Sequence, residues 1–253
     1  MTMHWRHLWG NQGRRTGARR VGWLWLLLVG LAGPAAHAQQ VLVQANVADD
    51  TTKNALGPNR RYFGHLYVGY GVVAGPAGWG AGLRYGLPSA ELRGGARLKL
   101  RFSQALAVNL DASYAYLRYE LTQNDQKTVP TPQLHRREYL GLHRLGAETS
   151  LRLNAGRRGN VVGRYLDLLA GGGWVAASTH TTEDAPAPGV GSVETTEYGL
   201  PYLRRWTGHL GARLGVDRYA LAGRYRVSSA FGPAHGAWPE LPRWVLGLEV
   251  GLF

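Results

Sequence analysis

Cysteine is absent from the 253 residues of this chain. Its absence excludes disulfides, thiolate nucleophiles, thiolate metal sites and cysteine-linked lipid anchors. After the first 33 residues, no apolar run reaches the roughly 18 residues of a membrane-spanning helix. A protein that crosses a membrane with a bundle of helices is therefore excluded as well.

Acidic residues are also few. The chain has 16 Asp and Glu against 29 Lys and Arg, which gives a formal net charge of +13. A basic chain can bind nucleic acid, but this sequence has no aromatic and basic platform of the RNA-binding type. We therefore expect no nucleic-acid partner. We expect the excess charge to meet an anionic membrane surface or carboxylates of the protein itself.

The first 38 residues contain the three parts of a secretory signal peptide. A basic region without acids precedes the short apolar segment Val21 to Gly33, and the pattern Ala36-His37-Ala38 follows. The apolar segment is shorter than the ~20 residues that a membrane anchor needs. We predict cleavage after Ala38 and a loosely ordered periplasmic leader at residues 39–61, which are polar and contain a Gly-Pro breaker.

From Tyr62 onward, apolar residues recur at every second position, as they do in half-buried strands. In residues 91–103, for example, Leu92 and Leu98 share one face while Arg93 and Arg97 share the other. Eight such segments occur, at about residues 62–74, 91–103, 105–121, 139–154, 161–179, 205–217, 219–227 and 243–253. The pattern predicts eight β-strands.

Two features depart from a regular pattern of eight alternating segments. In the third segment the apolar phase shifts to Leu117, Tyr119 and Leu121, which predicts a β-bulge. Residues 79–87 and 40–47 also alternate. If both of these stretches were strands, the total would be ten.

The connections between the segments alternate in length. Short ones join segments two and three, four and five, and six and seven, and much longer ones join the other pairs. Short turns on one side and long loops on the other are typical of an outer-membrane barrel. We therefore predict an all-β fold, an eight-stranded antiparallel transmembrane up-and-down β-barrel over residues 62–253, with ten strands as the alternative.

The charged face of the strands is expected to line the lumen. A soluble lipocalin-like barrel would place its apolar face inside instead, but the charged face mixes arginines with acids that can pair in a narrow interior. Side chains fill an eight-stranded barrel, so we predict a packed lumen rather than a channel. The predicted lumen network comprises Arg93, Arg97, Lys99, Arg101, Asp111, Arg144, Glu148, Arg152, Asp167, Arg205, His209, Arg213, Asp217, Arg224, Arg226 and Glu249. The pairs expected within it join Arg93, Arg97, Arg144, Arg213 and Arg224 to Asp111, Glu148, Asp167 and Glu249.

The signal peptide, the alternating segments, the long loops and Phe253 resemble the small outer-membrane β-barrel proteins of Gram-negative bacteria. The stretches "GRRGNVVGRYLDL" and "PELPRWVLGLEVGLF" are similar to barrel proteins of the Bacteroidetes lineage. The resemblance implies an outer-membrane location, with outer-membrane lipids, lipopolysaccharide and the barrel-assembly machinery as partners. It implies a structural role, or binding of an extracellular ligand by the long loops.

Some eight-stranded barrels are lipid A acyltransferases or deacylases, and such an enzyme is the alternative function. It would need a nucleophile, a histidine base and an orienting carboxylate near the outer rim. The candidate pieces are Ser178, His180, Glu183, Ser228, Ser229 and His143, and no spacing joins them. His143, beside Leu142, fits a second bulge or a rim position better than a base.

The connection after the fifth segment is expected to be a solvated outer loop. It carries Glu183, Asp184, Glu194 and Glu197, but these lack the ligand spacing of a calcium loop. The threonine pairs at 181–182 and 195–196 could extend the hairpin above the membrane. We expect no metal and no cofactor.

The sequence ends in "RWVLGLEVGLF". A terminal aromatic residue preceded by alternating apolar residues is typical of the assembly signal of an outer-membrane barrel, and we assign that signal to Leu252 and Phe253. The apolar set here is offset by one from Phe253. Either Phe253 overhangs the strand and Leu252 is its last lipid-facing residue, or a local twist realigns Phe253.

Overall fold

A computed structural model of the chain describes residues 57–156, 159–185 and 191–253. The predicted signal peptide, with Ala36 and Ala38, and residues 39–56 of the predicted leader lie outside these ranges. No helix in the described part of the chain is both long enough and apolar enough to span a membrane.

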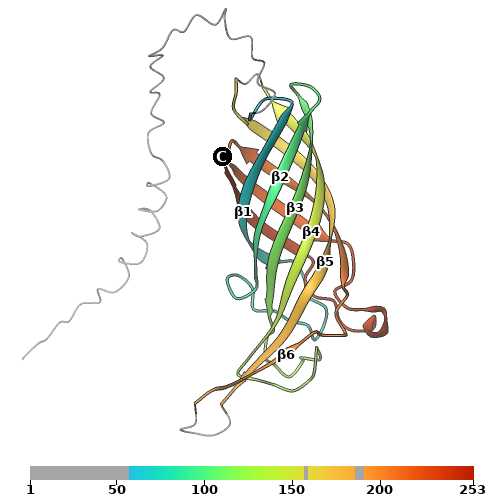
Figure 1. The fold of residues 1–253 in the computed structure, drawn as a ribbon. Helices are drawn as coiled ribbons and strands as arrows, with labels where there is room; N and C mark the ends of the chain where they lie inside the picture. Colours follow the sequence, from blue (N-terminus) through green and yellow to red (C-terminus); the bar gives the residue numbers. More distant parts are fainter. Residues whose placement is uncertain (1–56, 157–158, 186–190) are drawn as a thin grey trace, which may run out of the picture. The chain divides into compact units, whose positions relative to one another are not determined.

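The alternating segments form antiparallel strands, because each segment buries one face and exposes the other. The strands of the described residues are β1 (Tyr62–Ala74), β2 (Ala90–Arg101), β3 (Leu106–Glu120), β4 (Arg137–Ala155), β5 (Arg164–Asp184), β6 (Val193–Tyr198), β7 (Trp206–Val216), β8 (Tyr219–Arg226) and β9 (Trp244–Leu252). All of them except β6 lie side by side in a ring of tilted strands (Figure 1).

The strand order is β4-β3-β2-β1-β9-β8-β7-β5-β6, and pairing of β4 with β5 closes the ring. The predicted all-β antiparallel fold is therefore confirmed. Strand β6 pairs only with the far end of β5, and the two form a ribbon beyond the ring on the long-loop side (Figure 1). Residues 79–87 contribute one isolated bridge, between Leu83 and Leu121, rather than a strand. The other stretch of the ten-strand alternative, 40–47, lies outside the described residues.

The bulge predicted in the third segment is wrong. Strand β3 pairs with β4 without a register shift from Leu106 to Glu120. Leu117 and Tyr119 instead point inward and are 2% and 3% exposed, because the interior becomes apolar at the long-loop end. The register shift lies where β5 passes His143 and Arg144 of β4.

This apolar interior, which we call the loop-end core, joins strand residues to loop residues. It contains Val73, Ala81, Leu83, Leu117, Tyr119, Leu121, Val129, Leu140, Leu142, Val175, Leu200, Leu203, Ala230, Phe231 and Leu241. The long connections are thus folded over the end of the barrel and bury apolar surface there.

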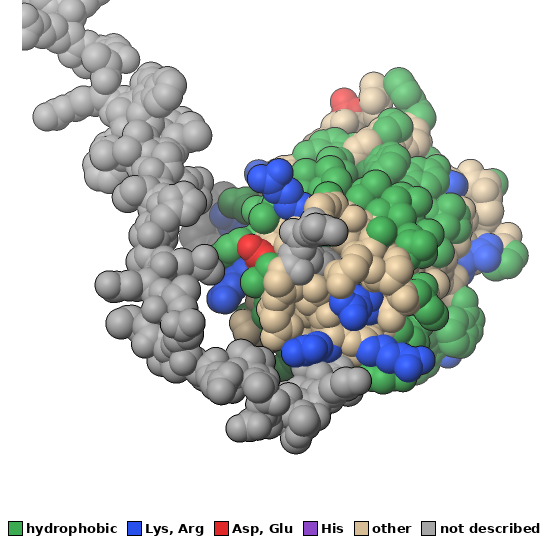
Figure 2. Space-filling model, turned by 90° about the horizontal axis from the view of Figure 1, so that it is seen from above, with side chains coloured by type: hydrophobic (Ala, Val, Ile, Leu, Met, Phe, Trp, Pro, Cys, Tyr) green, Lys and Arg blue, Asp and Glu red, His purple; other side chains and the backbone are tan. Residues whose placement is uncertain are grey.

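The outer wall of the ring is apolar. Leu66, Leu214 and Leu248 are 59%, 59% and 63% exposed, although leucine is usually buried in soluble proteins. Seen from the short-turn end, hydrophobic side chains cover the wall, and Lys and Arg side chains lie around the mouth (Figure 2). The soluble lipocalin-like arrangement, with its apolar face inside, is contradicted.

Candidate functional site: the charged lumen

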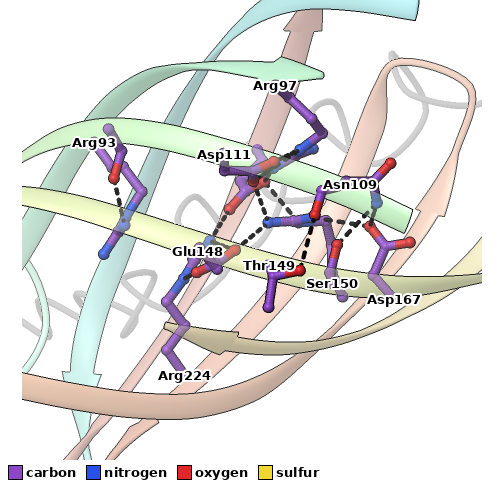
Figure 3. A network of polar contacts seen from close by, with 12 residues as sticks. Arg93, Arg97, Asn109, Asp111, Glu148, Thr149, Ser150, Asp167 and Arg224 are labelled. Atoms are coloured by element: carbon purple, nitrogen blue, oxygen red, sulfur yellow. Dashed lines mark hydrogen bonds and ion pairs between the residues drawn. The ribbon is translucent and has the colours of Figure 1, made fainter. Parts of the chain in front are cut away.

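The middle of the lumen is a charge-balanced cluster of four arginines and four carboxylates. It comprises Arg97, Arg152, Arg213, Arg224, Asp111, Glu148, Asp167 and Glu249, from β2, β3, β4, β5, β7, β8 and β9. All eight side chains point inward, because strand alternation places them on the face opposite the outer leucines. Figure 3 shows this network in close view.

Arg213 of β7 is the centre of the cluster. Its Nη1 lies 2.8 Å from Asp167 Oδ2, its Nη2 lies 2.8 Å from Glu148 Oε1, and its Nε lies 2.8 Å from Glu249 Oε2. It is 0% exposed. One guanidinium thus ties together carboxylates from three other strands, which a lysine ammonium could not do in the same planar geometry.

The remaining arginines of the cluster each bridge two strands or more. Arg97 Nη2 lies 2.7 Å from Asp111 and 3.0 Å from Glu249, and Arg152 Nε lies 2.7 Å from Asp167 Oδ1. Arg224 contacts Glu148 at 2.8 Å and Glu249 at 2.6 Å. Equal numbers of opposite charges in such close contact offset the cost of removing them from water.

Glu91 belongs to the lumen but is missing from the predicted set. Arg93 and Arg144, which we expected to pair with the four other acids, both contact Glu91 instead. Arg93 Nη2 lies 2.9 Å from Glu91 Oε1, and Glu91 is 3% exposed. The sequence indicates this position, because Glu91 precedes Arg93 by two residues and therefore lies on the same face of the strand.

Three more residues of the predicted network lie elsewhere or have other partners. Asp217 is in the turn between β7 and β8, exposed, with φ of 51°, and accepts the Gly163 N–H at 2.9 Å. Arg205 precedes β7 and is exposed, since the lumen-facing set of that strand begins later. Arg226 pairs with Glu240 of the β8–β9 loop at 2.8 Å.

Lys99 and Arg101 lie near the short-turn mouth and hold residues of the predicted leader. The Lys99 ammonium contacts the Pro58 carbonyl, and Arg101 Nη1 donates to Asn59 Oδ1 at 3.2 Å. Asn59 is 8% exposed. Pro58 and Asn59, at the end of the predicted leader, therefore contact the barrel.

The lumen side chains leave no open path at the level of the cluster. A wide channel would expose the groups that line it, yet Arg152, Asp167 and Arg213 are 1%, 0% and 0% exposed. His209, also predicted in the network, lies 3.0 Å from Glu148. Aromatic rings add to the packing: Arg152 lies 3.6 Å from the centre of the Tyr165 ring.

The serines and histidines considered as catalytic residues of an enzyme each contact a different partner. The Ser178 hydroxyl accepts the Leu200 N–H at 2.9 Å, and His180 Nε2 lies 2.8 Å from Glu138. Ser228 accepts the Gly208 N–H at 3.2 Å. Elsewhere, the Ser229 hydroxyl accepts the Phe231 N–H, and His143 contacts Tyr114 on the outer wall. In the described residues, no hydrogen bond joins one of these serines to a histidine.

The acids of the β5–β6 hairpin do not converge. Asp184 contacts His135 at 2.7 Å, Glu183 contacts Arg136 at 3.5 Å, and Glu197 lies 3.6 Å from His180. Glu194 accepts the Tyr139 hydroxyl at 3.4 Å. Within the described ranges, no group of His, Asp and Glu could hold a metal ion.

Phe253 turns into the short-turn mouth of the barrel. Its ring centre lies 5.2 Å from that of Phe63 and 5.1 Å from that of His65. Leu252 pairs with Leu66 and is 51% exposed on the outer wall. This geometry corresponds to the first of the two expected arrangements, in which Leu252 is the last outward residue of β9.

No family model matches the chain, and no curated protein matches it. Among solved structures, the chain is similar to Ail, the attachment invasion locus protein of Yersinia pestis, with 8% identity, a TM-score of 0.34, and coverage of 75% of this chain and 97% of that chain. The structure of Ail in complex with the heparin analogue sucrose octasulfate matches with 10% identity, a TM-score of 0.31 and the same coverage. A likeness at this level carries no function from Ail to this chain.

Proposed function

We propose that this protein is a closed outer-membrane β-barrel that acts at the cell surface through its long loops. The observation that carries the proposal is the inverted distribution of polarity. Leucines cover the outer wall, and a charge-balanced network fills the middle of the lumen. Such a barrel is stable only where the wall is out of water, and closed barrels satisfy all backbone groups within a bilayer.

The loop end supports a role in binding rather than transport. The loop-end core places Phe231, Leu200 and Leu241 at 1%, 6% and 1% exposure, so the loops rest on a packed base. Below this base, the central cluster blocks the lumen. Loops packed on the end of a sealed barrel are suited to presenting a surface, because binding residues are commonly carried by loops on a rigid scaffold.

Cell fractionation and electrophoresis test the barrel. The protein should be found with the outer membrane, and unboiled protein in detergent should migrate differently from boiled protein. Recovery in a soluble fraction, or identical mobility of both samples, would contradict the proposal. Reconstituted in planar bilayers, the protein should give no steady conductance, and a regular open-channel current would disprove the closed lumen.

Lipid analysis distinguishes the proposed function from the alternative, lipid A modification. Lipid A from cells with and without the gene should have the same acylation pattern if the protein is not an enzyme. A change that depends on Ser178 or His180 would favour the enzyme. The extracellular ligand itself is best sought by a pull-down with the full chain, in which the loops stay mounted on the barrel.

A further inference from the structure

A cluster of arginines lies on the outer wall, away from the lumen. Glu120 of β3 is on the outward face, in register with Tyr139 of β4, yet it is 1% exposed because arginines cover it. Arg84 Nη1 lies 2.6 Å from its Oε1, and Nη2 of Arg118 and Nη2 of Arg137 lie 3.0 and 3.6 Å from its Oε2. We call these three arginines, with Glu120, the arginine cradle.

The cradle carries more positive charge than it needs to satisfy its carboxylate. Three guanidinium groups around one carboxylate leave an excess of two charges. The next acid, Glu183, lies 3.9 Å from Arg137 but is shared with Arg136 at 3.5 Å, so this added pair leaves the excess unchanged.

The donors of the cradle remain accessible. The side chains of Arg84, Arg118 and Arg137 are 56%, 31% and 48% exposed. Glu120 holds the three guanidinium groups together, and their unused N–H groups are available to a second, larger anion.

The position of the cradle along the wall indicates what that anion is. On β3 the outward series runs from Leu110 through Tyr114 and Tyr116 to Arg118. At a rise of about 3.4 Å per residue, Arg118 lies about 7 Å beyond Tyr116 along the strand. Belts of tyrosine mark the headgroup level of a bilayer, so the cradle lies where lipid phosphates lie. The Tyr139 ring, 4.0 Å from the Arg118 guanidinium carbon, supports that side chain from β4.

We propose that the arginine cradle binds the phosphate of a phosphorylated glycolipid of the lipid A type, in the leaflet on the long-loop side. Paired N–H groups of arginine fit two phosphate oxygens at once, and three forks can hold one phosphate group. The acyl chains of the lipid then lie along Leu110 and Leu145, which are 49% and 50% exposed below the cradle. The choice of leaflet rests on the proposed function.

Binding of lipid to the purified full-length barrel tests the site. Native mass spectrometry in detergent would compare diphosphoryl lipid A, lipid A without phosphates, and phosphatidylglycerol. The variant carries Arg84→Gln, Arg118→Gln and Arg137→Gln. Its matched control carries Arg60→Gln, Arg61→Gln and Arg218→Gln, three exposed arginines at the short-turn end. Heat-modifiable migration verifies folding, and Arg84→Gln with Arg137→Gln replaces the triple variant if that one does not fold.

Diphosphoryl lipid A should bind the wild type and the control, and the cradle variant about tenfold more weakly. Lipid A without phosphates should bind the wild type as weakly as diphosphoryl lipid A binds the variant. Unchanged binding in the cradle variant, or equal binding of the dephosphorylated lipid, would overturn the site. Equal binding of phosphatidylglycerol would overturn the assignment to a glycolipid. A barrel that binds lipid A but is absent from the outer membrane would refute the proposed function while leaving the site intact.

Discussion

At the scale of single residues, Arg213 concentrates the electrostatics of the lumen. Replacing it with Met would leave Asp167, Glu148 and Glu249 buried in the lumen with fewer cations. Breaking a buried ion pair by removing one partner costs about 3–5 kcal/mol, and we expect Arg213→Met to lower the free energy of unfolding by about that amount. Urea unfolding in detergent micelles, followed by tryptophan fluorescence, measures it.

The matched control for this prediction is Arg205→Met, at the residue just before the same strand. Arg205 is exposed, and surface changes of this kind usually stay within about 0.5 kcal/mol. Equal effects of the two substitutions would mean that the network does not stabilise the barrel.

Leu252 and Phe253 differ in the face that they present. Leu252 is on the outer wall opposite Leu66, and Phe253 packs against Phe63 and His65 in the mouth. If the assembly machinery reads outward apolar residues of the last strand, Leu252→Ser should slow assembly more than Phe253→Ser. The rate at which the heat-modifiable form appears measures this. A larger effect of the Phe253 substitution would show that the assembly machinery recognises the aromatic ring instead.

Alternation identified most lumen residues from the sequence, because successive side chains of a strand point to opposite faces whichever strands it pairs with. It did not identify which charges meet. Arg93 and Arg144 pair with Glu91, and Arg226 pairs with Glu240. Which of these side chains meet depends on the tilt of the strands in the ring and on where the loop folds. Asp217 shows the converse case, since its sequence position matches the lumen face but a turn with positive φ carries it outside.

At the scale of elements, the seam between β1 and β9 depends on glycine. A Cβ at Gly247 would lie 2.4 Å from the Tyr70 carbonyl oxygen and 2.5 Å from the Gly71 Cα. Those atoms are backbone and cannot move without separating the two strands. We expect Gly247→Ala to cost about 1–3 kcal/mol of stability, as overpacking does.

The temperature at which the folded band disappears on a semi-native gel measures the effect of Gly247→Ala. Gly64→Ala, on β1 itself, is the matched control, because a Cβ there has no atom within 4 Å. A drop in melting temperature with both variants would show that loss of glycine, rather than crowding of the seam, is responsible.

The β8–β9 loop is fastened by Glu240, outside the strands. Burial by itself raises the pKa of this carboxyl, but the Arg226 charge and the Ala230 N–H outweigh it and hold the pKa below its ordinary value of 4.5. A carboxyl whose pKa is lowered in the folded state stabilises the fold at pH values above its ordinary pKa. This contribution is lost as the pH falls through the lower pKa of the folded state. We therefore expect the loop to loosen only below about pH 4.5.

Trp238 reports this loosening, since its ring centre lies 5.2 Å from Phe231 within the same loop. Its emission, obtained as the difference between the wild type and Trp238→Phe, should move to longer wavelength on acidification. In Glu240→Gln the emission should not change with pH in this range. A step in that variant would assign the transition to another group.

The loop-end core marks the limit of sequence reasoning for whole elements. Leu117, Tyr119 and Leu121 have the same spacing as outward leucines, so a change of phase was interpreted as a bulge. The interior is apolar there because the β6–β7 connection, with Leu200 and Leu203 about 80 residues later in the chain, folds over it. Such long-range contacts leave no local signal in the strand.

At the scale of the whole molecule, the absence of cysteine allows a direct test of how the barrel is oriented. Tyr198, 78% exposed at the end of β6, lies on the long-loop side, and Ser103 lies exposed in the short β2–β3 turn. Each of Tyr198→Cys and Ser103→Cys introduces the only thiol in the chain. Both sites are in water-exposed segments, so neither change should disturb the lumen or the wall.

If the long loops face the outside of the cell, a membrane-impermeant maleimide should label Tyr198→Cys on intact cells. Ser103→Cys should react only after the outer membrane is permeabilised, because the short turns would then face the periplasm. The opposite pattern would invert the barrel and place the arginine cradle in the inner leaflet. Equal labelling of both sites on intact cells, with folding verified by gel mobility, would mean that the apolar wall is not embedded in a membrane at all.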